Sequence, residues 1–321
     1  MTAEARIEHD RARPDGYFGP DSVAWRVLTA PATTLMIAQL TNLLEVPHRD
    51  FQAVLLGHDP LFPTNARRQR GWSGRSGTGG RFHDRLRRTV GVPLPMLFGD
   101  QRSARECADR LAQYHRPMSG VATDGRPYRA ADPDAMLFAA VTIAHAGLRA
   151  YEAFAFDGRP PRRLPPGDRD RYFAEMAELA VLMGVPRDRV PVSAAQIAGY
   201  YRSIAAEFTY LPGWFRAQLR TAAGLLRPNG RDDIAATLAD TALMASALLA
   251  ITALPAPSRR LHRLPALADP VLCLARLLSL PVLALVGTDR IGGAAVRWFL
   301  GADGAEDIGR ARALMNEGRN R

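Results

Sequence analysis

The amino-acid sequence predicts an all-α fold, a single domain of ten or more helices that extends over residues 1–321. Apolar residues recur at spacings of three and four along most of the chain, as they do on the buried face of a helix. The strict alternation that is typical of strands is scarce, and no internal repeat is present. With 47% hydrophobic and 23% charged residues among 321, the chain has enough apolar material for one large core.

The first helices are marked by histidines at their ends. A short apolar segment, 51–57, lies between His48 and His58 and is expected to form a short helix. A longer amphipathic helix is expected to begin at Ser103, a residue type that caps helix N-termini, and to end at His115. Proline and glycine follow His115 and stop the pattern.

The central helices have clearer boundaries. Asp132 is a suitable N-cap and Pro133 a suitable first residue, since its missing N–H costs nothing there. Apolar residues then continue for more than six turns on nearly every side, which predicts a buried central helix. Two further helices are expected over 167–183, where Gly184 ends the pattern, and over 193–208.

The C-terminal third contains the longest apolar runs of the chain. Thr241 to Pro255 is too short to cross a bilayer, and Val271 to Val286 is interrupted by Arg276 and Pro281. We therefore predict two core helices here and no membrane span. The polar N-terminal residues do not resemble a signal peptide, so we expect a cytoplasmic protein.

The residue types that are missing exclude several kinds of chemistry. All 42 basic residues are arginine, which excludes a Walker A lysine, a pyridoxal phosphate Schiff base and a lysine nucleophile. The two cysteines, Cys107 and Cys273, have no CxxC or CxxCH neighbour. We therefore expect no thiolate zinc site, no redox dithiol and no covalently attached haem, but two free thiols.

One segment differs in composition from the rest. Residues 63–80 are rich in glycine, serine and arginine, and Arg67 to Arg88 contains eight arginines and one aspartate. A mobile surface loop, a lid over an active site, and an anion or nucleic-acid contact all fit this composition. Because the chain has no recognised nucleic-acid module and few aromatic residues, nucleic acid is the least favoured partner.

Metal and hydrolase motifs are absent from the sequence. It contains no HExxH and no GxSxG, and its ExxH spacing at Glu45 and His48 has Pro47 inside it, which argues against a di-iron helix bundle. His145 lies on the predicted central helix, three residues after Thr142. A lone core histidine is most often held by a hydrogen bond.

A succession of short motifs is more specific than any single residue. The motifs are GYFGPDSVAWRV from Gly16, RLRRT from Arg85, LFGD from Leu97, the helix that ends in His115 before Gly120, DGRPYRAADPDAM from Asp124 and LRAYEAF from Leu148. In this order they resemble the MpaB-type oxygenase family, helical haem proteins that include the latex-clearing rubber oxygenases. The similarity extends from Gly16 to Pro212.

The resemblance implies a non-covalent haem b in a pocket between helices, with a histidine as iron ligand. His115 matches the ligand position, Arg85 and Thr89 match the family's Arg-x-x-x-Thr element, and Thr142 matches the threonine of its Trp-Val-His-Ala-Thr-Leu segment. A neutral imidazole is a common haem ligand, and arginine suits propionates or bound oxygen species. The predicted catalytic residues are Arg85, Thr89 and Thr142, and the predicted haem contacts are His115 (the metal ligand), Arg85, Arg88, Thr89 and His145.

Departures from the family pattern bear on the reaction. Ala140 takes the place of the family's histidine, only Arg116 remains of the arginines around the ligand, and Gly91 and Pro93 should break a helix that is regular in relatives. The sequence thus predicts a haem b-dependent oxidoreductase that uses O₂ or peroxide on a small apolar or aromatic molecule, in a specialised-metabolite tailoring step. The alternative is a haem- or lipid-binding protein of the same fold without turnover.

Overall fold

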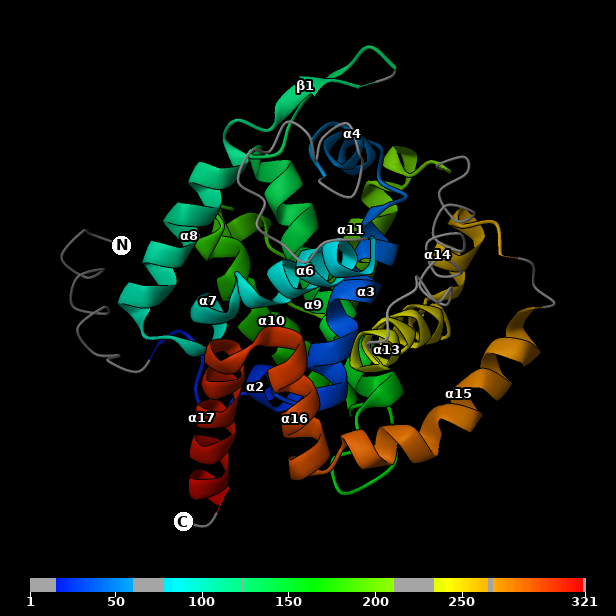
Figure 1. Ribbon diagram of the computed structural model, residues 1–321. Coiled ribbons are helices and arrows are strands. Elements are labelled where there is room, and N and C mark those ends of the chain that lie inside the picture. Colours follow the sequence, from blue (N-terminus) through cyan, green and yellow to red (C-terminus); the bar gives the residue numbers. More distant parts are fainter. Residues whose placement is uncertain (1–15, 60–77, 123, 211–233, 265–267, 320–321) are drawn as a thin grey trace.

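The computed structural model describes residues 16–59, 78–122, 124–210, 234–264 and 268–319, and these are mostly helical (Figure 1). More than ten helices are present, so the all-α prediction is confirmed. A small hairpin of strands β1 (Ser119–Val121) and β2 (Pro127–Arg129) pairs antiparallel, with Gly120 opposite Tyr128. The predicted loop over residues 63–80 lies outside the described residues as far as position 77.

Two helices form the centre of the fold. These are α3 (Pro31–Glu45) and α9 (Pro133–Phe154), which pack along much of their lengths. A glycine on α9 permits the close packing, because a Cβ at Gly147 would lie 3.1 Å from Leu28 and 3.2 Å from Ile37. The predicted start and burial of α9 are confirmed, although the side chain of Asp132, its N-cap residue, accepts no capping hydrogen bond.

The helices α2 (Val23–Leu28) and α10 (Pro166–Leu182) pack against this central pair. Tyr172 of α10 is fully buried and donates a hydrogen bond to the carbonyl oxygen of Ala144 at 2.9 Å, which ties α10 to α9. Gly184 has φ +89°, a conformation that favours glycine, and it follows the end of α10 as the sequence predicts.

A second group of helices packs against α3 through its first member and against α10 through the other two. α6 (Thr78–Gly91) ends where the sequence predicts a break, and α7 (Leu94–Phe98) and α8 (Gln101–His115) follow. The prediction that Ser103 caps α8 is wrong. The cap is Asp100, whose carboxylate accepts a hydrogen bond from the backbone N–H of Ser103 at 2.7 Å.

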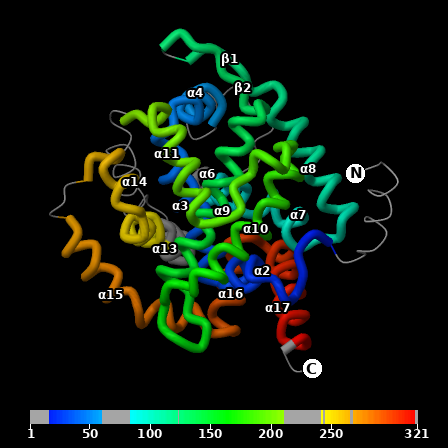
Figure 2. Tube along the Cα trace, turned by 180° about the vertical axis from the view of Figure 1, so that it is seen from behind, coloured from blue at the N-terminus to red at the C-terminus, as the bar shows by residue number. Residues whose placement is uncertain are grey.

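The remaining elements surround the centre (Figures 1 and 2). Ser193 caps α11 as predicted, but this helix ends at Ser203 and a 3₁₀ turn replaces the rest of the predicted segment. Figure 1 shows α8 on one side of the molecule, α13 to α15 on the other, and α16 and α17 below. The bounds are α4 (Arg49–His58), η1 (Arg187–Arg189), α11 (Ala194–Ser203), η2 (Ala205–Glu207), α13 (Ile234–Ile251), α14 (Ala256–Leu261), α15 (Ala268–Val286), α16 (Asp289–Leu300) and α17 (Ala302–Arg319).

The prediction that residues 271–286 form a core helix is wrong. These residues belong to α15, of which only Leu283 is buried, while large apolar side chains such as Leu278 are up to 70% exposed. The helix is long and apolar enough to cross a membrane by length and composition, so the predicted absence of a span is not confirmed. The reason for the error is the direction of the helix, because Arg276 faces the protein and the apolar side chains face away.

Candidate active site

A buried carboxyl group lies between the two central helices. Glu45 is the last residue of α3, its side chain is buried, and its Oε1 lies 2.8 Å from the hydroxyl of Thr142 on α9. Burial raises the pKa of Glu45 to about 8, although the Thr142 hydroxyl and the charge of Arg85 act in the opposite direction. Glu45 is therefore mostly a neutral acid at pH 7.

The hydrogen bonds of Thr142 agree with a protonated Glu45. The Thr142 hydroxyl also lies 2.9 Å from the carbonyl oxygens of Phe138 and Ala139. A hydroxyl has a single proton to donate and two lone pairs that accept. Thr142 donates to Glu45 Oε1 when the carboxylate is ionised. When Glu45 is protonated, Thr142 can donate to one of the carbonyls instead and accept the carboxyl proton.

An ion pair lies next to this acid. The guanidinium of Arg85 on α6 donates from Nε to Asp59, and both side chains are largely buried, with 15% and 6% of their areas exposed. Because Asp59 balances the charge of Arg85, the guanidinium does not force Glu45 to ionise. We call these four residues, Glu45, Thr142, Arg85 and Asp59, the Glu45 network.

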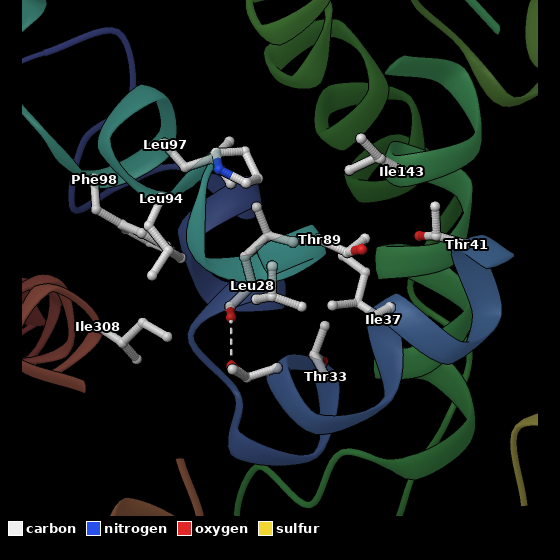
Figure 3. A pocket seen from close by; sticks show the side chains of 14 residues that line it. Leu28, Thr33, Ile37, Thr41, Thr89, Leu94, Leu97, Phe98, Ile143 and Ile308 are labelled. Atoms are coloured by element: carbon white, nitrogen blue, oxygen red, sulfur yellow. Dashed lines mark hydrogen bonds between the residues drawn. The ribbon is translucent and has the colours of Figure 1, made fainter. Parts of the chain in front are cut away.

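A cavity of about 30 Å³ lies between α3, α6, α7 and α9, next to the network (Figure 3). Thr41 is one turn before Glu45, and Thr89 is one turn after Arg85, so the two threonines connect the cavity with the network. The space holds a molecule of the size of water or O₂. The lining is otherwise mostly apolar and comprises Leu28, Thr33, Thr34, Ile37, Ala38, Thr41, Thr89, Val90, Pro93, Leu94, Leu97, Phe98, Ile143 and Ile308.

Two hydroxyl groups of this lining have unused hydrogen-bonding capacity. The side-chain oxygens of Thr33 and Thr41 are buried and have no partner among the described residues. By contrast, the Thr89 hydroxyl donates to the carbonyl oxygen of Arg85 at 3.1 Å. A buried hydroxyl without a partner is energetically costly, so these threonines favour a small polar or polarisable guest in the cavity.

An aromatic group lies near Glu45 and is centred on Tyr201. The hydroxyl of Tyr201 on α11 is 3.2 Å from Nδ1 of His145, and burial, together with the positive charges of Arg149 and Arg169, lowers the pKa of His145 to about 3. This histidine is neutral at pH 7 and is held by a hydrogen bond. The neighbouring rings are His48, Phe138 and Phe208, with ring centroids 4.3 Å apart for the stacked pair His48 and Phe138.

His115 lies apart from these groups, at the end of α8. Its Nδ1 is 3.0 Å from the carbonyl oxygen of Leu111, which can only accept, so Nδ1 carries the proton. Burial lowers the pKa of His115, so the ring is neutral and its Nε2 holds a lone pair. No described contact joins His115 to the cavity or to the Glu45 network.

The predicted arginines differ in their surroundings. Arg85 belongs to the network, whereas Arg88 is exposed on the same helix. Arg87 donates from Nε to the carbonyl oxygen of Leu300 at 2.8 Å. Arg85 and Arg87, which lie in the described part of the basic stretch, thus make contacts within the protein.

The sequence did not reveal every member of this site. In the sequence Glu45 stands out only through its ExxH spacing with His48, although a single carboxylate at the end of the apolar run 31–45 is a signal that a charged group is buried. Asp59 and Tyr201 carried no local signal. Among the described residues, no group of three His, Cys, Asp or Glu side chains is placed to hold a metal ion.

One family model matches the chain. It is described as "ER-bound oxygenase mpaB/B'/Rubber oxygenase, catalytic domain", and it matches residues 25–288. The chain belongs to this family. The match extends beyond the sequence similarity found above and includes α13, α14 and α15. No curated protein and no solved structure matches the chain. Membership of an oxygenase family indicates an enzyme that acts on a small molecule with O₂.

The donor chemistry of His115 fits haem iron. A haem-ligating imidazole commonly donates one ring N–H to a backbone carbonyl and binds the metal through the other nitrogen, which is the arrangement of Nδ1, Leu111 and Nε2 here. The cavity itself does not fit a macrocycle, because about 30 Å³ is far below the roughly 300–1,000 Å³ of ordinary ligand pockets. The cavity therefore suits the small reactant rather than the cofactor.

Proposed function

We propose that this protein is a haem b-dependent oxidoreductase that oxidises a small apolar or aromatic molecule with O₂ or peroxide, in a tailoring step on a specialised metabolite. The observation that carries the proposal is a neutral buried acid, Glu45, next to an apolar cavity in a chain of an oxygenase family. Haem, when bound, supplies the redox chemistry that no amino-acid side chain provides.

The role of Glu45 is to hold a proton at Oε1 or Oε2 in a buried position, next to a cavity of the size of one small molecule. Such a carboxyl acts as a general acid when its pKa lies near the working pH, and about 8 meets this condition. Thr142 orients the carboxyl, and Arg85 with Asp59 fixes the local charge. These residues would give a proton to a developing oxygen anion and take it back from solvent or product.

The cavity has the size of O₂ and favours this reactant through its low polarity. Its apolar lining disfavours charged molecules, because a charge there would lose its hydration without a partner. Thr41 and Thr89 offer hydroxyls at the end of the cavity near the network. In our proposal His115 would hold the iron of a bound haem, with Nε2 as the donor atom that its hydrogen bond to Leu111 leaves available. Arg85, Arg88, Thr89 and His145 keep their predicted roles as haem contacts.

The cofactor and its ligand can be tested by absorption spectroscopy. We expect purified protein supplied with haemin to show a Soret band that shifts on reduction with dithionite, and His115→Ala to lose it. His58→Ala is the matched control, because His58 ends α4 as His115 ends α8. A Soret band that His115→Ala keeps would refute His115 as the ligand, and no band in the wild type would refute haem binding.

The acid can be tested through the pH dependence of turnover. With Glu45 as general acid, kcat is expected to fall as the pH rises through about 8, and Glu45→Gln should abolish this limb and lower kcat by roughly 10²–10⁴-fold. Glu207→Gln, a more exposed carboxylate paired with Arg49, serves as the control. Haem retention with no turnover of any apolar substrate would instead favour the haem- or lipid-binding alternative.

A further inference from the structure

The outward side of α15 forms an apolar stripe that the described part of the protein leaves uncovered. Its members recur at spacings of three and four, so they lie on one face of the helix. Each is between 54% and 70% exposed, whereas surface helices normally turn such residues inward. The stripe, which we call the outer face of α15, consists of Val271, Leu274, Leu278, Val282 and Leu285.

The charged residues of α15 do not interrupt this face. Arg276 turns toward the protein, where its Nε donates to the carbonyl oxygen of Ala153 at 3.4 Å and its guanidinium lies 5.8 Å from the centre of the Phe154 ring. Asp269, in the first turn, pairs with Arg259 at 3.2 Å. Arg276, the only charged residue in the middle of α15, thus contacts α9, and the side chains on the opposite side of the helix are apolar.

The segments on both sides of α15 are basic. Residues 258–297 contain six arginines and two aspartates. Both aspartates are paired, Asp269 with Arg259 and Asp289 with Arg312. Arg260, before the helix, and Arg290 and Arg297, after it, are exposed and have no ion-pair partner among the described residues. Trp298, next to Arg297 on α16, is 40% exposed.

Two partners could cover the outer face, a second copy of this chain or a lipid surface, and the charge distribution favours the lipid surface. In a two-fold symmetric dimer the same surface meets itself, so an antiparallel pair of α15 helices would bring the basic segment before one helix against the basic segment after the other. Repulsion between arginines opposes that arrangement. An anionic lipid surface attracts both ends at once and accepts the apolar stripe between them.

We propose that the outer face of α15, with Arg260, Arg290 and Arg297 at its ends, docks on an anionic lipid bilayer. The helix lies in the plane of the membrane interface and does not cross it, because Arg276 and Leu283 hold its inner side to the protein. Interfacial helices combine an apolar face with basic residues, and the outer face of α15 with its neighbouring arginines has this combination. The inference does not depend on the proposed catalysis.

Vesicle flotation of the full chain tests this proposal. We expect the protein to float with phosphatidylcholine vesicles that contain phosphatidylserine and to bind pure phosphatidylcholine more weakly. The double variant Leu274→Gln and Leu278→Gln should reduce partitioning by roughly 100-fold, about tenfold for each leucine withdrawn from lipid. Val121→Gln is the matched control, because Val121 on β1 is 70% exposed, like Leu278.

The arginines and the depth of insertion can be tested separately. Arg290→Gln and Arg297→Gln should each weaken binding to the anionic vesicles about fivefold, and high salt should do the same. An environment-sensitive dye attached to Cys273, exposed on α15 while Cys107 is buried, should shift to shorter wavelength when vesicles are added. The same dye on Val121→Cys in a Cys273→Ser background should not shift.

The possible outcomes decide between the occupants. Flotation that is lost in the double variant, with unchanged circular dichroism, supports lipid docking. Absence of flotation would overturn the proposal. So would a concentration-dependent dimer without lipid that Leu274→Gln and Leu278→Gln dissociate, because the face would then belong to a second copy of this chain.

Discussion

The helices α9 and α15 are similar in composition and opposite in placement. Both are long and rich in apolar residues, and each has an arginine that donates to a backbone carbonyl oxygen: Arg149 to Ala253 and Arg276 to Ala153. Yet α9 is buried on most sides in the middle of the fold, whereas of α15 only Leu283 is buried. Hydrophobicity alone therefore does not determine whether a helix of this chain belongs to the core.

What separates the two helices is the presence of close neighbours. α9 has Gly147 where α2 and α3 approach, and it has Thr142, whose hydroxyl meets Glu45 of α3. α15 is attached through Arg276, which donates to the carbonyl oxygen of Ala153, and through the ion pair of Asp269 with Arg259, and the described residues do not cover its outer face. A helix is placed in the core by specific partners as well as by its apolar character.

Truncation of side chains should show the largest difference between the helices. Phe154→Ala on α9 removes a fully buried ring and should lower the free energy of unfolding by about 3–5 kcal/mol. Leu278→Ala on α15, at 70% exposure, should change it by less than about 0.5 kcal/mol without lipid. Urea denaturation measures both. Similar losses would mean that α15 is covered in solution.

The contact of α9 with Glu45 should make stability depend on pH. The folded state raises the pKa of Glu45 from 4.5 to about 8, so it binds the proton more tightly than the unfolded chain does. The resulting stabilisation is complete below pH 4.5 and is lost as the pH rises through about 8, a change on the order of 3 kcal/mol between pH 5 and 8. Thermal unfolding of Glu45→Gln should lack this trend, and a parallel trend in both proteins would contradict the assignment.

Alanine substitutions at two helical glycines, one closely packed and one with open space around it, should change the free energy of unfolding in opposite directions. A Cβ at Gly147 of α9 would lie 2.6 Å from the Tyr172 hydroxyl oxygen, so Gly147→Ala should destabilise the fold by about 1–3 kcal/mol. Gly293, on the helix after α15, has nothing within 4 Å, so Gly293→Ala should stabilise by up to about 1 kcal/mol. Opposite signs in urea denaturation are the expected result. Equal signs would argue against the packing of α9.

The smallest expected effect concerns the attachment of α15. Arg276→Met keeps an unbranched apolar stem and removes the hydrogen bond of the guanidinium and its contact with the Phe154 ring. A loss of about 0.5–1 kcal/mol is expected in denaturation experiments. Amide exchange along α15 should increase while that of α9 stays unchanged. Faster exchange in α9 as well would show that the two helices unfold together.

The sequence predicted the helix ends that depend on residues close to them in the chain. The start of α9 at Pro133, the end of α8 at His115 and the end of α10 before Gly184 all follow from residues with strong positional preferences. The cap of α8 was misplaced because Asp100 and Ser103 are both good capping residues within one turn, and the backbone geometry decides between them.

The sequence did not predict what depends on distant partners. The raised pKa of Glu45 and the proximity of Asp59 to Arg85 arise only when α3, α6 and α9 pack together. The exposure of α15 could not be read from its residues, since α9 is also a long apolar helix and forms the core. Arg85 and Thr142 were selected by resemblance, and the structure brings them together around Glu45. The predicted roles of His115, Arg88, Thr89 and His145 stay predictions.

The pairing of α3 with α9 also affects how fast this chain folds. The contact between Thr142 and Glu45 joins residues 97 positions apart, so a long loop must close before the central pair can form. Helical proteins usually fold within microseconds to milliseconds because their contacts are local, and non-local contacts slow the search. Refolding of this chain should therefore be slow for an all-α protein, with its central helices docking late, after the peripheral turns have formed.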